Sequence, residues 1–208
     1  MKHGQSFKTM AITINGNGTV TGISVGGLPD GIVDTDMIAA GAVTAAKATG
    51  STKGVTETDL WWISSSVTLS NGDYFTSNWE RADLQFEKIG TGMTESSGVF
   101  TFPSAGKWLL LYQFTGYDVS NNDASYVGVM AYTSTDAASS WSQSQSFYTN
   151  ATAIDAAHWT LNAHMIYDVT DASTFRIKWK YDATGSQRIF GHTSYPYSGI
   201  TFIKLGDT

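Results

Sequence analysis

The stretch from Ser97 to Thr115, SGVFTFPSAGKWLLLYQFT, decides the fold that this sequence predicts. A short β run, Val99 to Phe102, stops at Pro103, and a longer run begins at Trp108. Because Pro103 cannot donate to a β-ladder and Gly106 permits an unusual φ, we expect a tight turn between the runs, as in a hairpin.

The longer run is apolar on both faces. One face carries Trp108, Leu110, Tyr112 and Phe114, and the other carries Leu109, Leu111 and Gln113. A strand that is apolar on both sides is covered on both sides. We therefore expect a second sheet over the first face and a neighbouring subunit over Leu109 and Leu111.

Further alternating runs follow this stretch. From Trp159 to Tyr167 apolar residues alternate with Thr160, Asn162 and His164, and Phe175 to Asp182 alternates apolar with basic residues. Many short strands without a helix-length pattern are typical of an all-β sandwich or barrel.

Two segments carry a resemblance to a known family. GVFTFPSAGKWLLLYQF, 98–114, resembles the central hairpin of the complement C-one-q globular head, a relative of the tumour-necrosis-factor jelly rolls. SYPYSGITFIKLGD, 194–207, is similar to that family's last strand. Over residues 59–208 the resemblance implies an antiparallel jelly-roll sandwich of about ten strands that forms a homotrimer, the head domain of the chain.

We interpret the first part of the chain, residues 1–58, as an N-terminal virion anchor and shaft. Asn15-Gly16 between alternating residues predicts a hairpin, and 32–50 is Ala-rich with two short helix-like pieces. The segment GGLPDGIVDTDMIAAGAVTAAK, 26–47, resembles the linker of bacteriophage tail-fibre and virion proteins. A flexible tether of low complexity is the alternative, but spaced Ile, Val and Met residues favour anchoring to other virion proteins.

The composition of the chain argues against several classes of function. Lys plus Arg is 12 and Asp plus Glu is 18, so a net charge of −6 argues against a nucleic-acid partner. There is no cysteine, no apolar run approaches the ~20 residues of a membrane helix, and Met1 to Gln5 leads into no apolar signal region. A charged fraction of 14% suits an extracellular or virion protein. Without a secretory signal, such a protein would leave the cell by lysis, as part of a virus particle.

The sequence predicts no enzyme, no cofactor and no metal. His158 and His164 share one side of a strand about 20 Å apart, too far to bind one metal. Around a threefold axis, however, three copies of His164 would meet, which makes His164 a third interface candidate with Leu109 and Leu111. The run from Asp118 to Asp123 offers oxygens but lacks the calcium-loop pattern, so a turn is the better interpretation.

Longer loops indicate where a receptor would bind. Successive connections of an antiparallel jelly roll alternate between its ends. The connections 117–124, 150–158 and 183–196 are therefore expected at the tip away from the C-terminus. Their polar and aromatic candidates for receptor contact are Asn121, Asn122, His158, Arg188, His192 and Tyr195.

These observations predict a bacteriophage virion structural protein, a trimeric tail fibre or knob that contacts the host surface. Trp141, Tyr148, Tyr195 and Tyr197 fit a core poorly, and exposed rings suit either a host surface glycan or a trimer interface. The runner-up is a decoration or tail-adaptor protein whose head contacts other virion proteins. A secreted lectin-like jelly roll and a tail-spike depolymerase rank below it.

Overall fold

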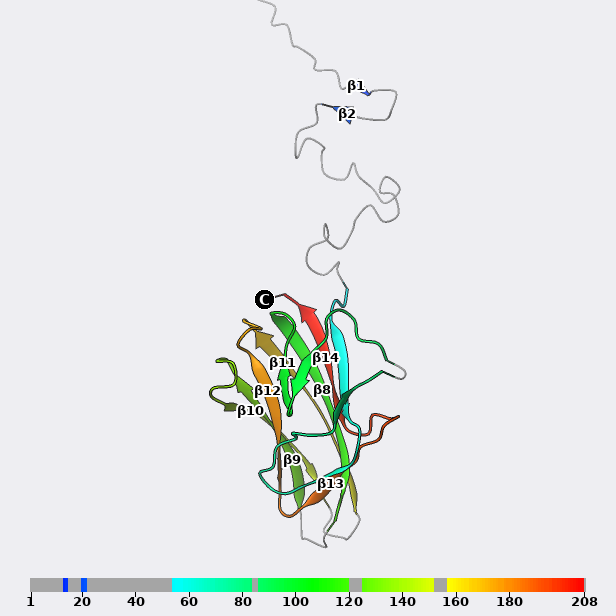
Figure 1. Cartoon of the computed structure of the whole chain (residues 1–208), viewed down its shortest axis with the longest axis vertical. Coiled ribbons are helices and arrows are strands. Elements are labelled where there is room, and N and C mark those ends of the chain that lie inside the picture. Colours follow the sequence, from blue (N-terminus) through cyan, green and yellow to red (C-terminus); the bar gives the residue numbers. More distant parts are fainter. Residues whose placement is uncertain are drawn as a thin grey trace, which may run out of the picture. The chain divides into compact units, whose positions relative to one another are not determined.

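Two units make up the chain, Met1–Ala48 and Thr49–Thr208. The computed structural model describes residues 13–14, 20–21, 54–83, 86–119, 125–151 and 157–207 (Figure 1). In the first unit β1 (Thr13–Ile14) pairs antiparallel with β2 (Val20–Thr21), which confirms the hairpin expected around Asn15-Gly16. The helix-like pieces expected within 32–50 lie outside the described residues.

The second unit is built from two antiparallel sheets (Figure 1). One has five strands in the order β10-β9-β12-β7-β6, and the other has seven in the order β4-β13-β8-β14-β3-β5, with β11 paired to β8. The strands are β3 (Thr58–Ile63), β4 (Val67–Leu69), β5 (Trp79–Arg81), β6 (Thr94–Ser96), β7 (Val99–Thr101), β8 (Gly106–Asp118), β9 (Tyr126–Ser134), β10 (Ser142–Asn150), β11 (His158–Val169), β12 (Arg176–Ala183), β13 (Gln187–Ile189) and β14 (Gly199–Gly206). The all-β antiparallel prediction is therefore confirmed.

The strand number differs slightly from the prediction of about ten. Twelve strands form the two sheets, because β6 and β13 add three-residue strands that are too short to show an alternating pattern. The described residues contain no helix that is long and apolar enough to cross a membrane.

The core lies between the sheets and is rich in aromatic rings. The inward residues of β8 (Trp108, Leu110, Tyr112 and Phe114) are at most 2% exposed, as are Ile177, Trp179 and Tyr181 of β12. Trp179 lies at the centre, with its ring centroid 5.1 Å from Phe100 and 5.8 Å from Trp79. The inward faces predicted for β8, β11 and β12 are confirmed.

The predicted hairpin between the two runs of the first stretch is wrong. β7 pairs with β6 and β12, whereas β8 pairs with β11, β13 and β14 in the other sheet. The turn at 103–105 therefore crosses between sheets, and Phe102 and Trp108 meet in the core from opposite layers, 5.3 Å apart. Gly106 enables the crossing at a φ of 145°, where an added Cβ would come within 2.5 Å of the Gly206 carbonyl oxygen.

Strand ends collect at the two ends of the sandwich, as the alternating connections predict. At the end that holds the C-terminus, Gly106 lies opposite Val169 and Lys107 opposite Gly206 (Figure 1). At the far end, Tyr117 lies opposite His158. The ends of β8, β10 and β12 and the starts of β9, β11 and β13 therefore share the far end.

Candidate functional site

The outer face of the seven-stranded sheet carries exposed apolar side chains. In the register of the sheet, Leu109 lies between Ile166 of β11 and Ile203 of β14, and Leu111 lies between His164 and Thr201. Leu111 is 41% exposed and Ile166 is 52% exposed. We call Leu109, Leu111, His164, Ile166 and Ile203 the apolar patch.

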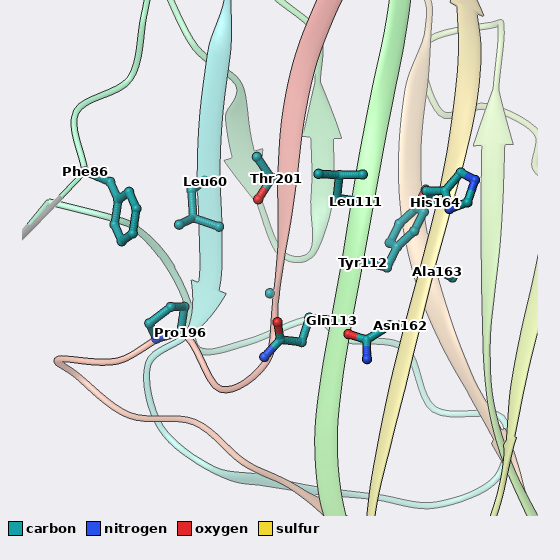
Figure 2. A pocket seen from close by; sticks show the side chains of 11 residues that line it. Leu60, Phe86, Leu111, Tyr112, Gln113, Asn162, Ala163, His164, Pro196 and Thr201 are labelled. Carbon is teal, nitrogen blue, oxygen red and sulfur yellow. The ribbon is translucent and has the colours of Figure 1, made fainter.

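A groove opens on this face beside the patch. It has a volume of about 480 Å³, and its walls include Leu60, Phe86, Leu111, His164 and Pro196 (Figure 2). Phe86 and Pro196 come from connecting segments and Leu60 from β3, so the groove floor is sheet and one wall is loop. Apolar surface left open in this way is typical of a protein–protein contact.

The three residues predicted for a subunit interface are thus brought together. Leu109 and Leu111 are two residues apart on the outward side of β8, and His164 lies directly opposite Leu111. The ion pair of Lys107 with Asp168 bounds the patch at the end near the C-terminus. At its other border the patch gives way to the polar pairs Gln113–Asn162 and Thr115–Thr160.

Beyond these polar pairs the same face carries an aromatic strip. His158 and Phe190 each lie within 6 Å of the Tyr117 ring, and Phe190 lies 6.0 Å from Tyr197. The strip continues through Tyr195 and His192, whose ring centroids are 4.6 Å apart. Its members are Tyr117, His158, Phe190, His192, Tyr195 and Tyr197.

Hydrogen bonds fix the segment after β13, which carries four of the six residues of the strip. The Phe190 N–H donates to the Thr115 carbonyl oxygen at 2.8 Å, and the Ser198 hydroxyl bonds both backbone groups of Thr115 at 3.1 Å. The Ser194 N–H donates to His192 Nδ1 at 3.0 Å. The segment is therefore anchored at both ends, while Tyr195 and Tyr197 remain 55% and 45% exposed.

The predicted receptor-contact residues lie partly elsewhere than expected. His158 and Arg188 belong to strands β11 and β13, and both are exposed near the far end. His192 and Tyr195 belong to the connection between β13 and β14, where the His192 N–H bonds the Ile63 carbonyl oxygen beside the end of β3. They are therefore not at the tip, because β13 interrupts the single loop expected over 183–196.

Three of the six receptor candidates share the aromatic strip. His158, His192 and Tyr195 are linked through Tyr117, Phe190 and Tyr197, and Arg188 lies opposite Tyr117 in the sheet. Asn121 and Asn122 lie outside the described residues. Sequence reasoning missed Tyr117 and Phe190 because their neighbours come from other strands, and only the strand register reveals the continuity.

The acidic and histidine side chains of the described residues are scattered. Within the described ranges, no group of three or more His, Asp or Glu side chains is arranged to hold a metal ion. Asp118, which the sequence placed in a loop with other oxygen donors, is instead the last residue of β8 and is only 1% exposed. Its side chain belongs to the interior and not to a surface loop.

Comparison with known proteins supports the fold. No protein-family profile and no curated protein sequence matches the chain. The structure of Eiger TNF from S. frugiperda is similar, with a TM-score of 0.58 and 13% identity, over 73% of this chain and 93% of that chain. Murine APRIL at pH 5.0 is also similar, with a TM-score of 0.53 and 12% identity, over 72% and 98% of the two chains. Likeness at this identity concerns the fold alone, and residues of the second unit therefore form a TNF-like jelly roll.

Proposed function

We propose that the protein is a bacteriophage virion structural protein, a homotrimeric fibre or knob whose jelly-roll head contacts the host surface. The apolar patch is the observation that supports a trimer. Its residues Leu111 and Ile166 are about half exposed in the single chain, so their apolar surface is available to a neighbouring copy. Obligate interfaces between subunits are apolar and bury large areas. The role is non-enzymatic, and the virion location rests on the resemblance of 26–47 to phage fibre linkers.

Threefold packing suits the patch better than a flat dimer contact. The family that the sequence resembles forms trimers, and His164 beside Leu111 places a polar ring where three copies would meet. A polar residue within an apolar interface can specify the register and number of subunits. The groove of about 480 Å³ next to Leu111 offers room for a side chain of the neighbouring copy.

The aromatic strip serves as the proposed host-contact surface. Six residues separate Leu111 from Tyr117 along β8, which corresponds to about 20 Å. We place the strip where the three heads separate below the patch, open to a host glycan. Aromatic rings stack on the apolar faces of sugars, and three copies on one trimer multiply weak single-site affinity.

The position of the protein on particles tests the virion role. Phage particles should carry the full chain, and a variant that lacks 1–50 should fold but be absent from purified particles, because the anchor is missing. Cryo-microscopy of the particles then separates two outcomes. Heads that project freely support a fibre, whereas heads buried among other virion proteins support the decoration or adaptor function.

A further inference from the structure

A second aromatic and cationic cluster lies on the outer face of the other sheet. The ammonium nitrogen of Lys178 is 4.3 Å from the centroid of the Tyr74 ring and 4.1 Å from that of Trp141. Tyr132 lies opposite Lys178 in β9, and Lys180 is the next outward residue of β12. We call Tyr74, Tyr132, Trp141, Lys178 and Lys180 the lysine cluster.

Backbone pairing holds the Tyr74 ring in place. The Tyr181 N–H donates to the Asp73 carbonyl oxygen at 2.8 Å, and the Phe75 N–H donates to the Trp179 carbonyl oxygen at 3.1 Å. Residues 73–75 therefore extend the sheet beside β12. Alternation buries Phe75 in the core, at 2% exposure, and turns Tyr74 outward to the lysines.

The lysine cluster has no ion pair with any residue that the structure describes. Neither Lys178 nor Lys180 takes part in any of the ion pairs among the described residues, which are Arg81–Asp59, Lys107–Asp168 and Lys204–Asp207. Arg176, on the same face of β12, instead donates to the carbonyl oxygens of Ala172, Ser173 and Phe175. In a chain with a net charge of −6, two ammonium groups without an ion pair on one strand face are a local concentration of positive charge.

The Lys178 ammonium is partly desolvated. Desolvation lowers the pKa of Lys178, because its charged form has lost part of its water shell. The rings of Tyr74 and Trp141 stabilise the ammonium but carry no net charge, so they leave its hydrogen-bond donors free for an oxygen ligand.

An exposed flat ring lies next to the lysines on the same face. Tyr148 of β10 covers Gly128, where an added Cβ would come within 2.4 Å of the ring. The Tyr148 hydroxyl donates to Asp182 at 2.9 Å, and the residue is 53% exposed. Asp182, which the Tyr148 hydroxyl contacts, follows Lys180 by two residues and Lys178 by four on β12. Along the strand this position is therefore about 7 Å from Lys180 and about 13 Å from Lys178.

We propose that this face binds an acidic saccharide, with its carboxylate on Lys178 and Lys180 and its sugar ring on Tyr148. A carboxylate forms charge-assisted hydrogen bonds with ammonium groups, and the apolar face of a sugar stacks on an aromatic ring. The face belongs to the opposite sheet from the apolar patch, so it stays open when the patch is covered. The proposal does not depend on the virion role.

Calorimetric titration of the full chain with an acidic and a neutral tetrasaccharide tests the proposal. Tetragalacturonate should bind, maltotetraose should bind at least about tenfold more weakly, and added salt should weaken the uronate binding. The double variant K178M/K180M should lose about tenfold or more in uronate affinity, because methionine keeps the side-chain length without the charge. The control K107M removes an exposed lysine of the other sheet and should leave the affinity unchanged.

Other outcomes would overturn the proposal. Equal binding of the neutral tetrasaccharide would exclude carboxylate recognition, and competition by inorganic phosphate at equal concentration would indicate a simple anion site. Unchanged affinity of K178M/K180M would exclude the lysines. An NMR titration of the unmodified chain covers the case in which the double variant misfolds, since the Trp141 indole N–H resonance should shift with uronate, and an unmoved resonance would contradict the site.

Discussion

Leu111 and His164 lie directly opposite each other on the outer face of the seven-stranded sheet, one on β8 and the other on β11. Leu111 is 41% exposed, and the flanking Leu109 and Ile166 also pair across these two strands. His164 and Ile166 lie on β11, which pairs with β8 alone, so the patch reaches the edge of the sheet. In our proposal a second and a third copy of the chain cover these exposed apolar side chains.

The first prediction concerns this patch. Leu111→Arg should dissociate the trimer at micromolar concentration, because three guanidinium groups would then be buried near one axis without partners. Sedimentation velocity of the variant measures the effect. The matched control is Val55→Arg, which also replaces an exposed apolar residue, 52% exposed, but lies outside the patch. If both variants stay trimeric, the patch is not the interface.

The second prediction concerns the aromatic strip. Changing His192 and Tyr195 together to Ala should reduce adsorption of phage particles to host cells while the mass and melting temperature of the trimer stay unchanged. The reason is that both side chains lie on an anchored segment and make their ring contacts mainly with each other and Tyr197.

The outcome of this double change separates two uses of the strip. Loss of the trimer would show that the strip is part of the subunit interface, which the sequence had left open. Normal adsorption with an intact trimer would favour the adaptor function. Ile89→Ala, at a residue that is 47% exposed and away from the strip, should change neither adsorption nor mass.

The sequence predicts the fold well where local alternation is clear. The inward sides of β11 and β12 follow directly from period-two patterns, since each strand faces the core on one side only. The relation of β7 to β8 could not be predicted in this way. A turn at Pro103 is compatible with a hairpin or with a crossing between sheets, and only the long-range pairing of β7 with β12 decides between them.

The candidate surfaces were predicted less completely than the fold. Leu109, Leu111 and His164 could be found because they lie on the second face of regular strands. The aromatic strip joins β8, β11 and the segment after β13, and the lysine cluster joins residues 74, 132, 141, 178 and 180. Such clusters depend on the order of the strands in the sheets, which local sequence patterns do not reveal.

The third prediction concerns the core. Trp179→Ala should lower the free energy of unfolding by about 3–5 kcal/mol, because a fully buried indole is removed and leaves a cavity. Urea unfolding at a fixed protein concentration measures the loss. Tyr197→Ala, at a 45% exposed position, should change stability by only about 0.5 kcal/mol. Similar losses in both variants would contradict the central position of Trp179.

The fourth prediction concerns the dependence of stability on pH. In the turn between β9 and β10, the Ser134 hydroxyl donates to Asp136 at 2.6 Å, and Ser140 donates to it through its N–H and its hydroxyl. These bonds lower the pKa of Asp136 to about 2 from its ordinary 3.8. A lowered folded pKa contributes stability that is present above 3.8 and is lost as the pH falls through about 2.

Asp136→Asn should therefore melt below the unmodified protein at pH values above about 4.5, and the difference should shrink toward pH 2. Thermal melts across this range measure both proteins. Asp171, whose pKa is also lowered by its bonds with Ser173, is present in both proteins and cancels from the difference. A difference that is constant with pH would contradict the role of the Asp136 carboxylate.

The central claim is that three copies of this chain assemble through the outer face of the seven-stranded sheet. Light scattering coupled to size-exclusion chromatography of the purified full chain tests it most directly. The account predicts a mass of three times 22.4 kDa that persists on dilution to micromolar concentration. A stable species of 22.4 kDa under the same conditions would contradict it.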